Sequence, residues 1–383
     1  MTLKTDLLII GAGPFGLSLA AQAKHDGIEH IVVGKSMEFW RRNMPKGMFL
    51  RSACDWHLDP QNVHTIEAYL KTLNKTASDV EPLSLEFYLS YVAWFQKQKQ
   101  IEPGSSYIAR LDLNLDAFVA TTVDGTSINT RRVVLAPGFK HFTHVPQKLR
   151  AKLPSNRVQH TCDFVDFSNA KDKRFLIVGG RQSAFEWAAL LLEAGAAEVH
   201  IAHRHSSPSF AVADWSWVMP LVDRIESDPG WFRRLSQVEK DEIVQRMWAE
   251  GRLKVEPWLE ARLNHARAKI WENTEVESCV AGEDLKVMLT GERTLNVDEV
   301  VLATGYKVDV ARLPYLSAGN VMQKLETKNG FPVLDENFET SVPGLFITSM
   351  PAVQDFGPYF GFTIAARASA KIIANALRSR ALF

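Results

Sequence analysis

The chain opens with a short apolar run that ends in glycines and then continues as an apolar helix pattern. Residues 7–10 are Leu-Leu-Ile-Ile, and residues 11–16 are Gly-Ala-Gly-Pro-Phe-Gly. An uninterrupted apolar run of this length is typical of a strand buried on both faces of a parallel sheet. Proline in the first helical turn and glycine at position 27 predict a helix that ends near residue 25. A second strand is expected at residues 28–34.

A second unit of the same kind lies in mid-chain. Residues 175–178 form an apolar run, Gly179 and Gly180 follow it, and an apolar helix pattern extends over residues 184–194. A further short strand is expected at residues 199–202. A strand, a glycine turn, a helix and a strand in this order predict a βαβ unit of a parallel sheet. We therefore expect two units of one fold type in this chain.

The glycines of the first turn have the spacing that binds a dinucleotide. Gly11 permits a tight turn, Gly13 lets the backbone approach a diphosphate, and Gly16 lets the helix pack closely on the strand. The free N–H groups and the positive dipole end of the helix would face that diphosphate. A glycine-rich turn in another α/β fold is the alternative interpretation.

In each of the two units, the second strand ends without the acidic residue that is usual there. A carboxylate about 20 residues beyond the glycines normally holds the ribose hydroxyl, but the first unit has Gly34, Lys35 and Ser36 there and no carboxylate before Glu38. We expect Lys35, Ser36 or Glu38 to contact ribose. In the second unit Arg204 occupies this position. An arginine without an acid favours a ribose 2′-phosphate, and hence NADPH over NADH.

Two further apolar strands end in turns of small residues, at residues 136–138 and 303–305. Small residues at a strand end let the backbone lie close to a bound cofactor or to a crossing between domains. Gly138 and Gly305 are therefore candidate cofactor contacts.

Composition narrows the class of protein. A length of 383 residues is enough for two or three domains. The residues are 46% apolar and 23% charged, as in an ordinary globular protein. Basic and acidic residues are equal in number, at 44 each, so charge gives no reason to expect a nucleic acid or a membrane as partner. The chain has no apolar stretch of about 18 residues and no signal-peptide pattern, so we expect a cytoplasmic protein.

Cysteines and histidines do not form a recognisable redox or metal pattern. Cys54, Cys162 and Cys279 lie far apart, so neither a dithiol centre nor a zinc site is expected. His203 and His205 alternate onto one face of a predicted strand, but no third ligand is evident. No metal is therefore expected.

The motifs resemble those of flavoproteins with two dinucleotide-binding domains. In order, they are GAGPFG (11–16), APG (136–138), GGRQSAFE (179–186), ATGY (303–306) and PGLF (343–346). The chain looks most like the class B flavin monooxygenases, which include flavin-containing monooxygenases, ornithine and lysine N-hydroxylases, and a bacterial FAD-dependent urate hydroxylase-like branch. Residues 39–52, 214–217 and 355–362 resemble that last branch.

The resemblance implies an α/β fold with two Rossmann-like domains. A discontinuous FAD domain would comprise residues 1–150 and 295–383, and an NADPH domain, residues 151–294, would be inserted into it. A helical insertion is expected at about residues 212–266, where half of the ten tryptophans lie. This insertion could cap a planar aromatic substrate, form a helical cover or provide the face of a homodimer.

The matching motifs also imply the residues of each site. The FAD diphosphate would be held by Gly11, Gly13, Pro14, Phe15 and Gly16. The path to the flavin ring would be lined by Trp40, Met48, Arg51 and Ser52. Asp355 would lie near the ribityl chain or the pyrimidine edge. NADPH would be held by Gly179, Arg181, Gln182, Ser183 and Arg204.

The implied function is that of an NADPH- and O2-dependent monooxygenase. Hydride would pass from NADPH to FAD, and a flavin C4a-hydroperoxide would insert one oxygen atom into a small heteroaromatic or amine-bearing substrate. The proton donor would be Arg51, His57 or Asp355, although His57 could equally be a loop histidine without a catalytic part. The absence of a CxxC pair argues against the disulfide-reductase relatives.

Two alternatives remain at this stage. The first is an NAD(P)H-dependent reductase that passes electrons to a quinone or a protein acceptor without oxygen insertion. The second is a non-catalytic flavoprotein that serves as a redox sensor. Arg204 and the intact second unit weigh against the second alternative, because a sensor needs no site for a hydride donor.

Overall fold

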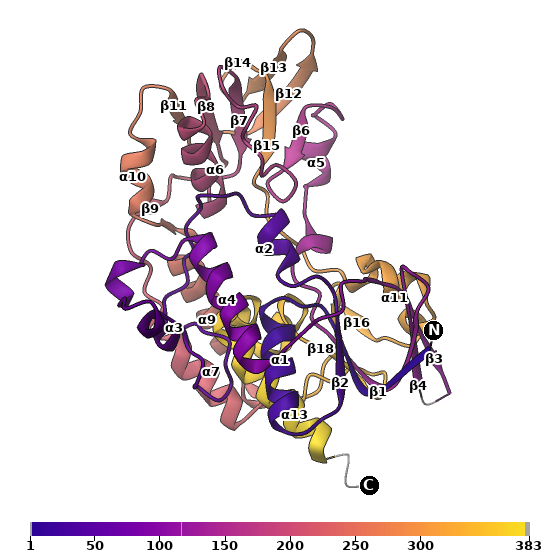
Figure 1. Cartoon of the computed structure of the whole chain (residues 1–383). Helices are drawn as coiled ribbons and strands as arrows, with labels where there is room; N and C mark the ends of the chain where they lie inside the picture. Colours follow the sequence, from indigo (N-terminus) through magenta and orange to yellow (C-terminus); the bar gives the residue numbers. More distant parts are fainter. Residues whose placement is uncertain (1, 116, 380–383) are drawn as a thin grey trace.

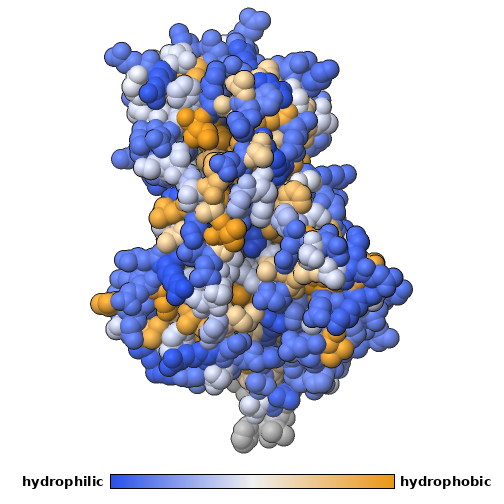
Figure 2. All heavy atoms as spheres, turned by 90° about the vertical axis from the view of Figure 1, so that its left-hand side faces the viewer, coloured by the Kyte–Doolittle hydropathy of each residue, from blue (hydrophilic) through white to orange (hydrophobic). Residues whose placement is uncertain are grey.

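The structure is a computed structural model that describes residues 2–115 and 117–379. Figure 1 shows two lobes joined by a narrower middle, and each lobe is built on its own sheet. Figure 2, which shows the left-hand side of that view, places many apolar side chains around the narrower middle. None of the described helices is both long enough and apolar enough to cross a membrane.

The lower lobe contains a mostly parallel sheet. Its strands are β1 (Thr2–Ile10), β2 (His30–Val33), β3 (Ile108–Asn114), β4 (Ala117–Thr122), β5 (Ser127–Leu135) and β18 (Leu345–Ile347). Their order is β2-β1-β5-β4-β3, and β18 also pairs with β5. The strands β1, β2, β5 and β18 run parallel, whereas β3 and β4 extend the sheet as an antiparallel pair. Residues 7–10 are buried, as their apolar run predicts.

Helices cover this sheet and build the rest of the lower lobe. Helix α1 (Pro14–His25) has Pro14 in its first turn and packs against α13 (Ala366–Ser379). Helix α4 (Leu85–Lys99) begins after Ser84, whose Oγ accepts a hydrogen bond of 3.1 Å from the Phe87 N–H. The remaining elements of the lobe are α2 (Glu38–Arg42), α3 (Ile66–Thr72), α11 (Pro314–Ala318), α12 (Val353–Phe356), β16 (Thr327–Lys328) and β17 (Phe331–Pro332).

The upper lobe contains a five-stranded parallel sheet. In spatial order its strands are β11 (Ala268–Trp271), β8 (Glu198–Ala202), β7 (Arg174–Val178), β15 (Glu299–Leu302) and β6 (Val158–His160). One face packs on α6 (Gln182–Glu193) and α10 (Trp258–Leu263). The other packs on the antiparallel strands β12 (Val276–Ala281), β13 (Leu285–Leu289) and β14 (Arg293–Val297). The central strands β7 and β15 are covered on both faces, so residues 175–178 and 300–302 read as continuous apolar runs. The short helix α5 (Gln147–Arg150) precedes β6.

Two chain segments cross between the lobes, and they are hydrogen-bonded to each other. The His144 N–H donates to the Gly305 carbonyl at 2.9 Å, and the Thr304 hydroxyl donates to the His144 carbonyl at 2.5 Å. The second crossing begins after β15, at residue 303, and not near residue 295 as the motifs implied. The reason is that β14 and β15 complete the upper lobe, where β15 pairs with β7 and β6.

The helical insertion packs on both lobes, although it lies between strands of the upper lobe in sequence. Its elements are β9 (Ser209–Phe210), α7 (Val218–Ser227), α8 (Trp231–Arg234), α9 (Gln237–Arg252) and β10 (Lys254–Val255). The helices α7, α8 and α9 pack on the lower lobe, and the short strands β9 and β10 pack on the upper lobe. Val218, Val222 and Ile225 form the buried stripe of α7, and α7 contacts α13.

Residues 212–266 were expected to belong to the NADPH domain. The α7 stripe, Phe232 and Met247 instead belong to the core of the lower lobe, whereas Val255, Leu259 and Leu263 belong to the core of the upper lobe.

Candidate active site between the lobes

The carboxyl ends of both parallel sheets face the middle of the molecule. Strand β5 continues at residue 136 into one crossing segment, and β15 continues at residue 303 into the other. Because β1 is parallel to β5 and β7 is parallel to β15, the turns after β1 and β7 face the middle as well. Both glycine turns therefore lie where the lobes meet, at the strand ends where parallel sheets bind ligands.

Two glycines of the first turn are required by close backbone contacts. Gly11 has a φ of +113°, and a Cβ atom there would lie 2.2 Å from the Ala136 carbonyl oxygen. A Cβ atom at Gly16 would lie 1.8 Å from the Gly11 carbonyl oxygen. No residue with a Cβ atom fits either position. Glycine at these positions therefore lets β1, β5 and α1 pack together at the turn.

The third glycine of this turn borders open space. Gly13 has an ordinary φ of −85°, and a Cβ atom there would meet nothing within 4 Å. No side chain caps α1, so the N–H groups of its first turn, including that of Phe15, face this space after Pro14. Gly138, at the end of β5, also has nothing within 4 Å of an added Cβ. This arrangement fits a dinucleotide diphosphate.

Several buried hydroxyl groups of the lower lobe have no hydrogen-bond partner among the described residues. Among them are those of Thr348, directly after β18, and of Tyr359, in the turn after α12. Buried polar groups are normally paired, so such hydroxyls indicate a missing ligand or water. Asp355, which was predicted near the flavin, accepts a hydrogen bond of 3.1 Å from the Leu334 N–H, and burial raises the pKa of its carboxyl group.

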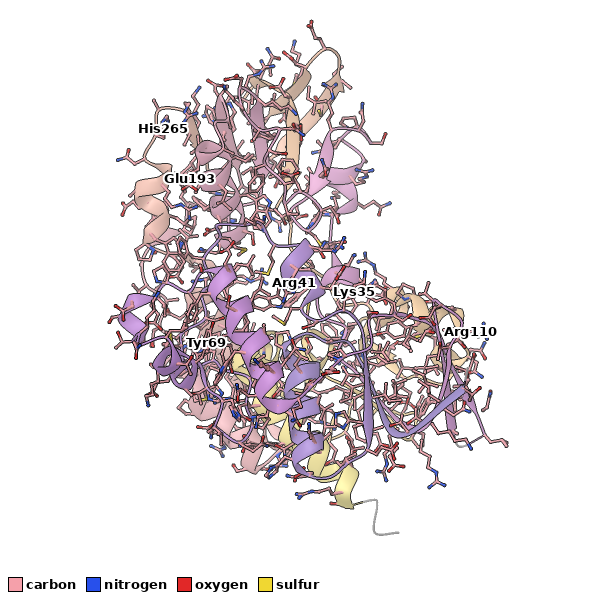
Figure 3. The ribbon with its side chains drawn as sticks, viewed as in Figure 1. Lys35, Arg41, Tyr69, Arg110, Glu193 and His265 are labelled. Carbon is pink, nitrogen blue, oxygen red and sulfur yellow. The ribbon has the colours of Figure 1, made fainter. Side chains whose placement is uncertain are left out.

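The three residues predicted to contact ribose differ in whether their polar groups already have partners in the protein. Ser36 donates its hydroxyl hydrogen to Gln96 at 2.6 Å, and Glu38 forms an ion pair within α2. Lys35 is exposed, with its Nζ 5.5 Å from the centre of the Tyr107 ring. Figure 3 shows Lys35 on the part of the lower lobe that faces the upper lobe. Lys35 is therefore the freest of the three.

The segment 39–52, whose residues were predicted to line the path to the flavin, runs along the junction. Trp40 stacks on Tyr88 with the ring centres 4.9 Å apart. Met48 packs partly buried against the core, and its carbonyl accepts a hydrogen bond of 3.1 Å from the Leu85 N–H. Ser52 is partly exposed.

Arg51, also in this segment, binds the helical insertion. Its Nε lies 2.7 Å from Glu256, and its Nη1 donates to the Gly251 carbonyl at 2.7 Å. Its guanidinium also lies 5.4 Å from the ring centre of Trp215. The side chains of Arg51 and Glu256 are only 17% and 7% exposed. Arg51 therefore joins the lower lobe to the insertion, whatever part it takes in catalysis.

Trp215 brings together motifs that are far apart in sequence. Its ring centre lies 6.1 Å from Trp56 and 6.2 Å from Phe362, and its indole N–H has no partner among the described residues. The structure thus joins the segment 39–60, the DWSW motif and the end of the DFGPYFGF motif in one aromatic cluster. We call Trp56, Trp215 and Phe362 the indole cluster.

His57 lies beside the cluster but is not a cation at neutral pH. Its Nδ1 accepts a hydrogen bond of 3.2 Å from the Asp59 N–H, and its Nε2 contacts the Arg367 guanidinium. Burial, and then the positive charge of Arg367, lower the pKa of His57 to about 3. No hydrogen bond or ion pair within the described chain joins any two of the proposed proton donors Arg51, His57 and Asp355.

The second glycine turn has the same construction as the first. Gly179 has a φ of +143°, and an added Cβ would lie 2.4 Å from the Ala303 carbonyl oxygen. An added Cβ at Gly180 would lie 2.4 Å from His203. Sequence reasoning assigned no role to Gly180, because only the fold brings His203 against it. Helix α6 has no side-chain cap either, so its first turn can receive a phosphate group.

The next two predicted NADPH contacts lie in the first turn of α6. Ser183 is exposed, and Gln182 accepts a hydrogen bond of 3.0 Å at its Oε1 from the Glu256 N–H. Because the Glu256 carboxylate binds Arg51, the start of α6 is connected through one residue to the segment 39–52.

Three arginines gather beside this turn. Arg181 and Arg252 each lie 4.9 Å from the centre of the Trp248 ring, on which both guanidinium groups stack, and Arg181 also donates to the Arg252 carbonyl. Burial, and then the charges of Arg252 and Arg204, lower the pKa of Arg181. Within the described chain no carboxylate lies within 4.0 Å of any of the three. Sequence reasoning missed Trp248 and Arg252, which are distant in sequence and belong to no motif.

A buried carboxylate fastens the segment 39–52 to the upper lobe. Glu186 of α6 is 1% exposed, and its Oε1 accepts hydrogen bonds from Arg262 at 2.9 Å and from the Phe49 N–H at 3.3 Å. Phe49 also contacts Trp258 edge-on, with ring centres 6.0 Å apart. Burial raises the pKa of Glu186, and the hydrogen bond and charge of Arg262 oppose that rise. Together with Arg51, this contact forms what we call the clasp.

The fold and the two facing glycine turns are those of a flavoprotein oxidoreductase with two dinucleotide-binding domains. The family model of the pyridine nucleotide-disulphide oxidoreductases matches residues 5–348, and the chain belongs to this family. Its three cysteines, Cys54, Cys162 and Cys279, are free. The family and the fold of its relatives indicate a flavin and a nicotinamide cofactor.

Curated relatives are similar at low identity. The ferredoxin–NADP reductase of Acholeplasma laidlawii is 29% identical over 49% of this chain and 51% of its own length. The FAD-dependent urate hydroxylase of Xanthomonas campestris pv. campestris is 22% identical over 82% of this chain and 68% of its own length. The chain thus aligns with only about half of the first of these relatives.

Solved structures share the fold over the whole chain. An ornithine N-hydroxylase of Kutzneria sp. 744 has a TM-score of 0.81 at 15% identity, covering 99% of this chain and 100% of its own. A bacillithiol disulfide reductase of Staphylococcus aureus has a TM-score of 0.69 at 21% identity, covering 99% of both chains. At these identities the likeness establishes the fold.

Proposed function

We propose that this chain is an FAD- and NADPH-dependent monooxygenase that inserts one oxygen atom from O2 into a small heteroaromatic or amine-bearing substrate. Bound FAD would accept hydride from NADPH and then react with O2. The observation that carries the proposal is that two uncapped helices after glycine turns face the same junction between the lobes.

FAD is assigned to the lower lobe. The space beside Gly13 and the uncapped first turn of α1 suit a diphosphate, and the unpartnered hydroxyls of Thr348 and Tyr359 suit the polar parts of a flavin. The clasp residue Arg51 lies in the segment proposed to line the path to the ring.

NADPH is assigned to the upper lobe. Arg181, Arg204 and Arg252 form a cluster of positive charge without a neighbouring carboxylate in the described chain, beside the uncapped start of α6. Like charges repel, so a bound anion would stabilise this cluster. A diphosphate at the turn and a 2′-phosphate among the arginines would supply that charge, which favours NADPH over NADH.

The substrate is assigned to the region of the indole cluster. Trp56, Trp215 and Phe362 offer apolar rings, and the free Trp215 N–H offers one hydrogen-bond donor. Relatives are named for urate and trimethylamine, and a solved structure of the same fold is named for cadaverine. These names share small nitrogen-containing molecules, which supports a heteroaromatic or amine-bearing substrate.

The decisive experiment follows the oxygen atom. The FAD-loaded protein would be supplied with NADPH, isotopically labelled O2 and, one at a time, urate, trimethylamine, cadaverine and ornithine. A monooxygenase consumes NADPH faster with its substrate and places one labelled oxygen atom in the product, detected by mass spectrometry. NADPH consumption that yields only hydrogen peroxide with every candidate, including a wider panel of amines and heteroaromatics, would refute oxygen insertion.

A reductase without oxygen insertion is the second candidate. It is supported by the similarity to two ferredoxin–NADP reductases, one 29% identical over 49% of this chain and the other 28% identical over 59% of it. It predicts that a quinone or a ferredoxin is reduced at the expense of NADPH in the absence of O2, with a turnover above that of the aerobic reaction.

A further inference from the structure

A pocket of about 420 Å³ opens in the lower lobe, apart from both glycine turns. Its walls come from the loop that carries Asp55 and His57, from α3, from Met219 of α7 and from Arg367 in the first turn of α13. No residue of either glycine turn lines it. The volume falls in the range of small-molecule sites, which is roughly 300–1,000 Å³.

Arg367 is a partly buried cation that no described carboxylate touches, although Asp55, Asp223 and Glu226 act on its charge from farther away. Its Nη1 contacts the His57 Nε2 and lies 3.2 Å from the Asn62 Oδ1, and its Nη2 is 4.0 Å from the Met219 sulfur. Within the described chain no carboxylate lies within 4.0 Å of this guanidinium, and its Nε has no acceptor among the described residues. A partly buried guanidinium that touches no carboxylate can still gain from a ligand anion in direct contact with it.

The groups that touch Arg367 are neutral. Burial and the charge of Arg367 lower the pKa of His57 to about 3, so this imidazole is uncharged near neutral pH. Asn62 and Met219 carry no charge. The guanidinium fork therefore keeps its full positive charge and two directed donors for a ligand, the pattern that binds a carboxylate or a phosphate bidentately.

The rest of the pocket discriminates between anions. Asp55 and Glu67, both exposed, add negative charge to its lining, and Glu67 is paired with Lys71 at 2.8 Å. Leu70 and Met219 supply apolar wall. Carboxylates in the lining repel a dianion more strongly than a monoanion, and the apolar wall favours a hydrocarbon body.

We propose that this pocket binds a small monocarboxylate with an apolar body, and that Arg367 holds its carboxylate. The site is separate from the two dinucleotide sites. It does not depend on the reaction proposed above, because it follows from Arg367 and its surroundings alone.

Benzoate is the probe, and benzamide and inorganic phosphate are its comparisons. Calorimetric titration of the FAD-loaded protein should detect benzoate binding, while benzamide and phosphate should bind at least about 10-fold more weakly. Arg367→Gln should weaken benzoate binding by about 10-fold or more. Arg367→Lys should give an intermediate affinity, because the charge stays but the fork is lost. Arg378→Gln, on the exposed end of the same helix, is the matched control and should leave the affinity unchanged.

Several results would overturn the proposal. They are the absence of benzoate binding at millimolar concentration, equal affinity for benzamide, and undiminished binding by Arg367→Gln. If Arg367→Gln does not fold, Asp55→Asn tests the same idea in the opposite direction. Removing this exposed carboxylate should tighten benzoate binding, and a weaker affinity would contradict the proposal. Flavin reduction by NADPH, measured on the same samples, reports on the proposed function independently.

Discussion

Glycines of the two turns serve different purposes, which their surroundings distinguish. Gly11, Gly16 and Gly179 are forced by backbone contacts shorter than 2.5 Å to an added Cβ, whereas Gly13 borders open space. The first kind stabilises the fold, and the second kind keeps room for a ligand.

Gly13→Ala should therefore impair FAD binding, whereas Gly16→Ala should impair the stability of the protein. Gly13→Ala should fold with a free energy of unfolding within about 1 kcal/mol of the parent chain, yet bind FAD more weakly, because the methyl group enters the diphosphate space. Gly16→Ala should destabilise the protein itself, since its methyl group would lie 1.8 Å from the Gly11 carbonyl oxygen. Thermal unfolding without FAD and FAD titration separate the two. Normal FAD affinity in Gly13→Ala would contradict the assignment.

Arg204 should act on NADPH and not on NADH. Its side chain is exposed, so Arg204→Ala should leave the fold intact. The variant should raise the dissociation constant for NADPH by about 10-fold, because one charge-assisted contact with the 2′-phosphate is lost. NADH binding should change little. Arg110→Ala, at the far edge of the lower lobe in Figure 3, is the control. Equal losses for both nucleotides would place Arg204 outside a 2′-phosphate site.

His57 should make the protein less stable as the pH falls. Its pKa is about 3 in the folded chain and about 6.5 when unfolded. Between these values only the unfolded chain binds the proton, so stability falls as pH falls from about 6.5, by at most about 1.4 kcal/mol per pH unit. His57→Gln should flatten this slope, and exposed His25→Gln should not. Denaturant unfolding at several pH values measures this slope. An unchanged slope in His57→Gln would show that folding does not lower the pKa of His57.

At single residues, backbone geometry gives a reason for Gly11, Gly16 and Gly179, because only glycine fits those contacts. The glycine spacing predicted the first turn, and the order of strand, turn, helix and strand predicted the second. The sequence did not predict a role for Trp248 and Arg252 beside Arg181, because their approach to Arg181 depends on how α9 packs in three dimensions. The roles predicted for Arg51, His57 and Asp355 remain predictions.

At the scale of elements, the segment 39–52 links the two lobes. It belongs to the lower lobe in sequence, but Phe49 binds Glu186 of α6, and Arg51 binds Glu256 and the end of α9. The clasp therefore holds the proposed flavin wall against the helix that is proposed to bind NADPH.

Glu186→Gln should loosen the clasp. Arg262 loses its charged inner partner but keeps Glu193 at 2.7 Å, and glutamine keeps an acceptor for the Phe49 N–H, so the change should cost about 1.5 kcal/mol of stability. Flavin reduction by NADPH should slow, while the dissociation constant for NADPH changes less, because the clasp positions the lobes without touching the phosphates. Glu193→Gln removes the outer, half-exposed partner of the same arginine and should cost less than about 1 kcal/mol. Equal effects of the two variants, in stability and in reduction rate, would contradict a special role for Glu186.

Periodicity predicted the existence of most elements better than their membership in a lobe. The strand at 299–302 was expected from its apolar run, yet it completes the upper sheet and not the lower one. Its composition is the same as that of a lower-lobe strand, and only pairing with β7 and β6 decides between them. The helical insertion likewise shows a clear apolar stripe on α7, but the stripe does not reveal that α13 covers it.

At the scale of the whole molecule, two parallel sheets point their carboxyl ends at one junction. Paired crossing segments, the clasp and the insertion all hold that arrangement. The order of motifs predicted the two-lobe α/β architecture, because each glycine turn fixes the end of a strand and the start of a helix. It could not predict the contacts between lobes, which involve residues from several distant segments.

The central claim is that one chain holds FAD and NADPH close enough for hydride transfer across this junction. The most direct measurement is anaerobic titration of the FAD-loaded protein with NADPH while the visible flavin absorbance is recorded. Stoichiometric bleaching of the flavin by NADPH, faster than by NADH at equal concentration, is the predicted result. A protein that takes up no FAD, or whose bound FAD stays oxidised in excess NADPH, would contradict the account.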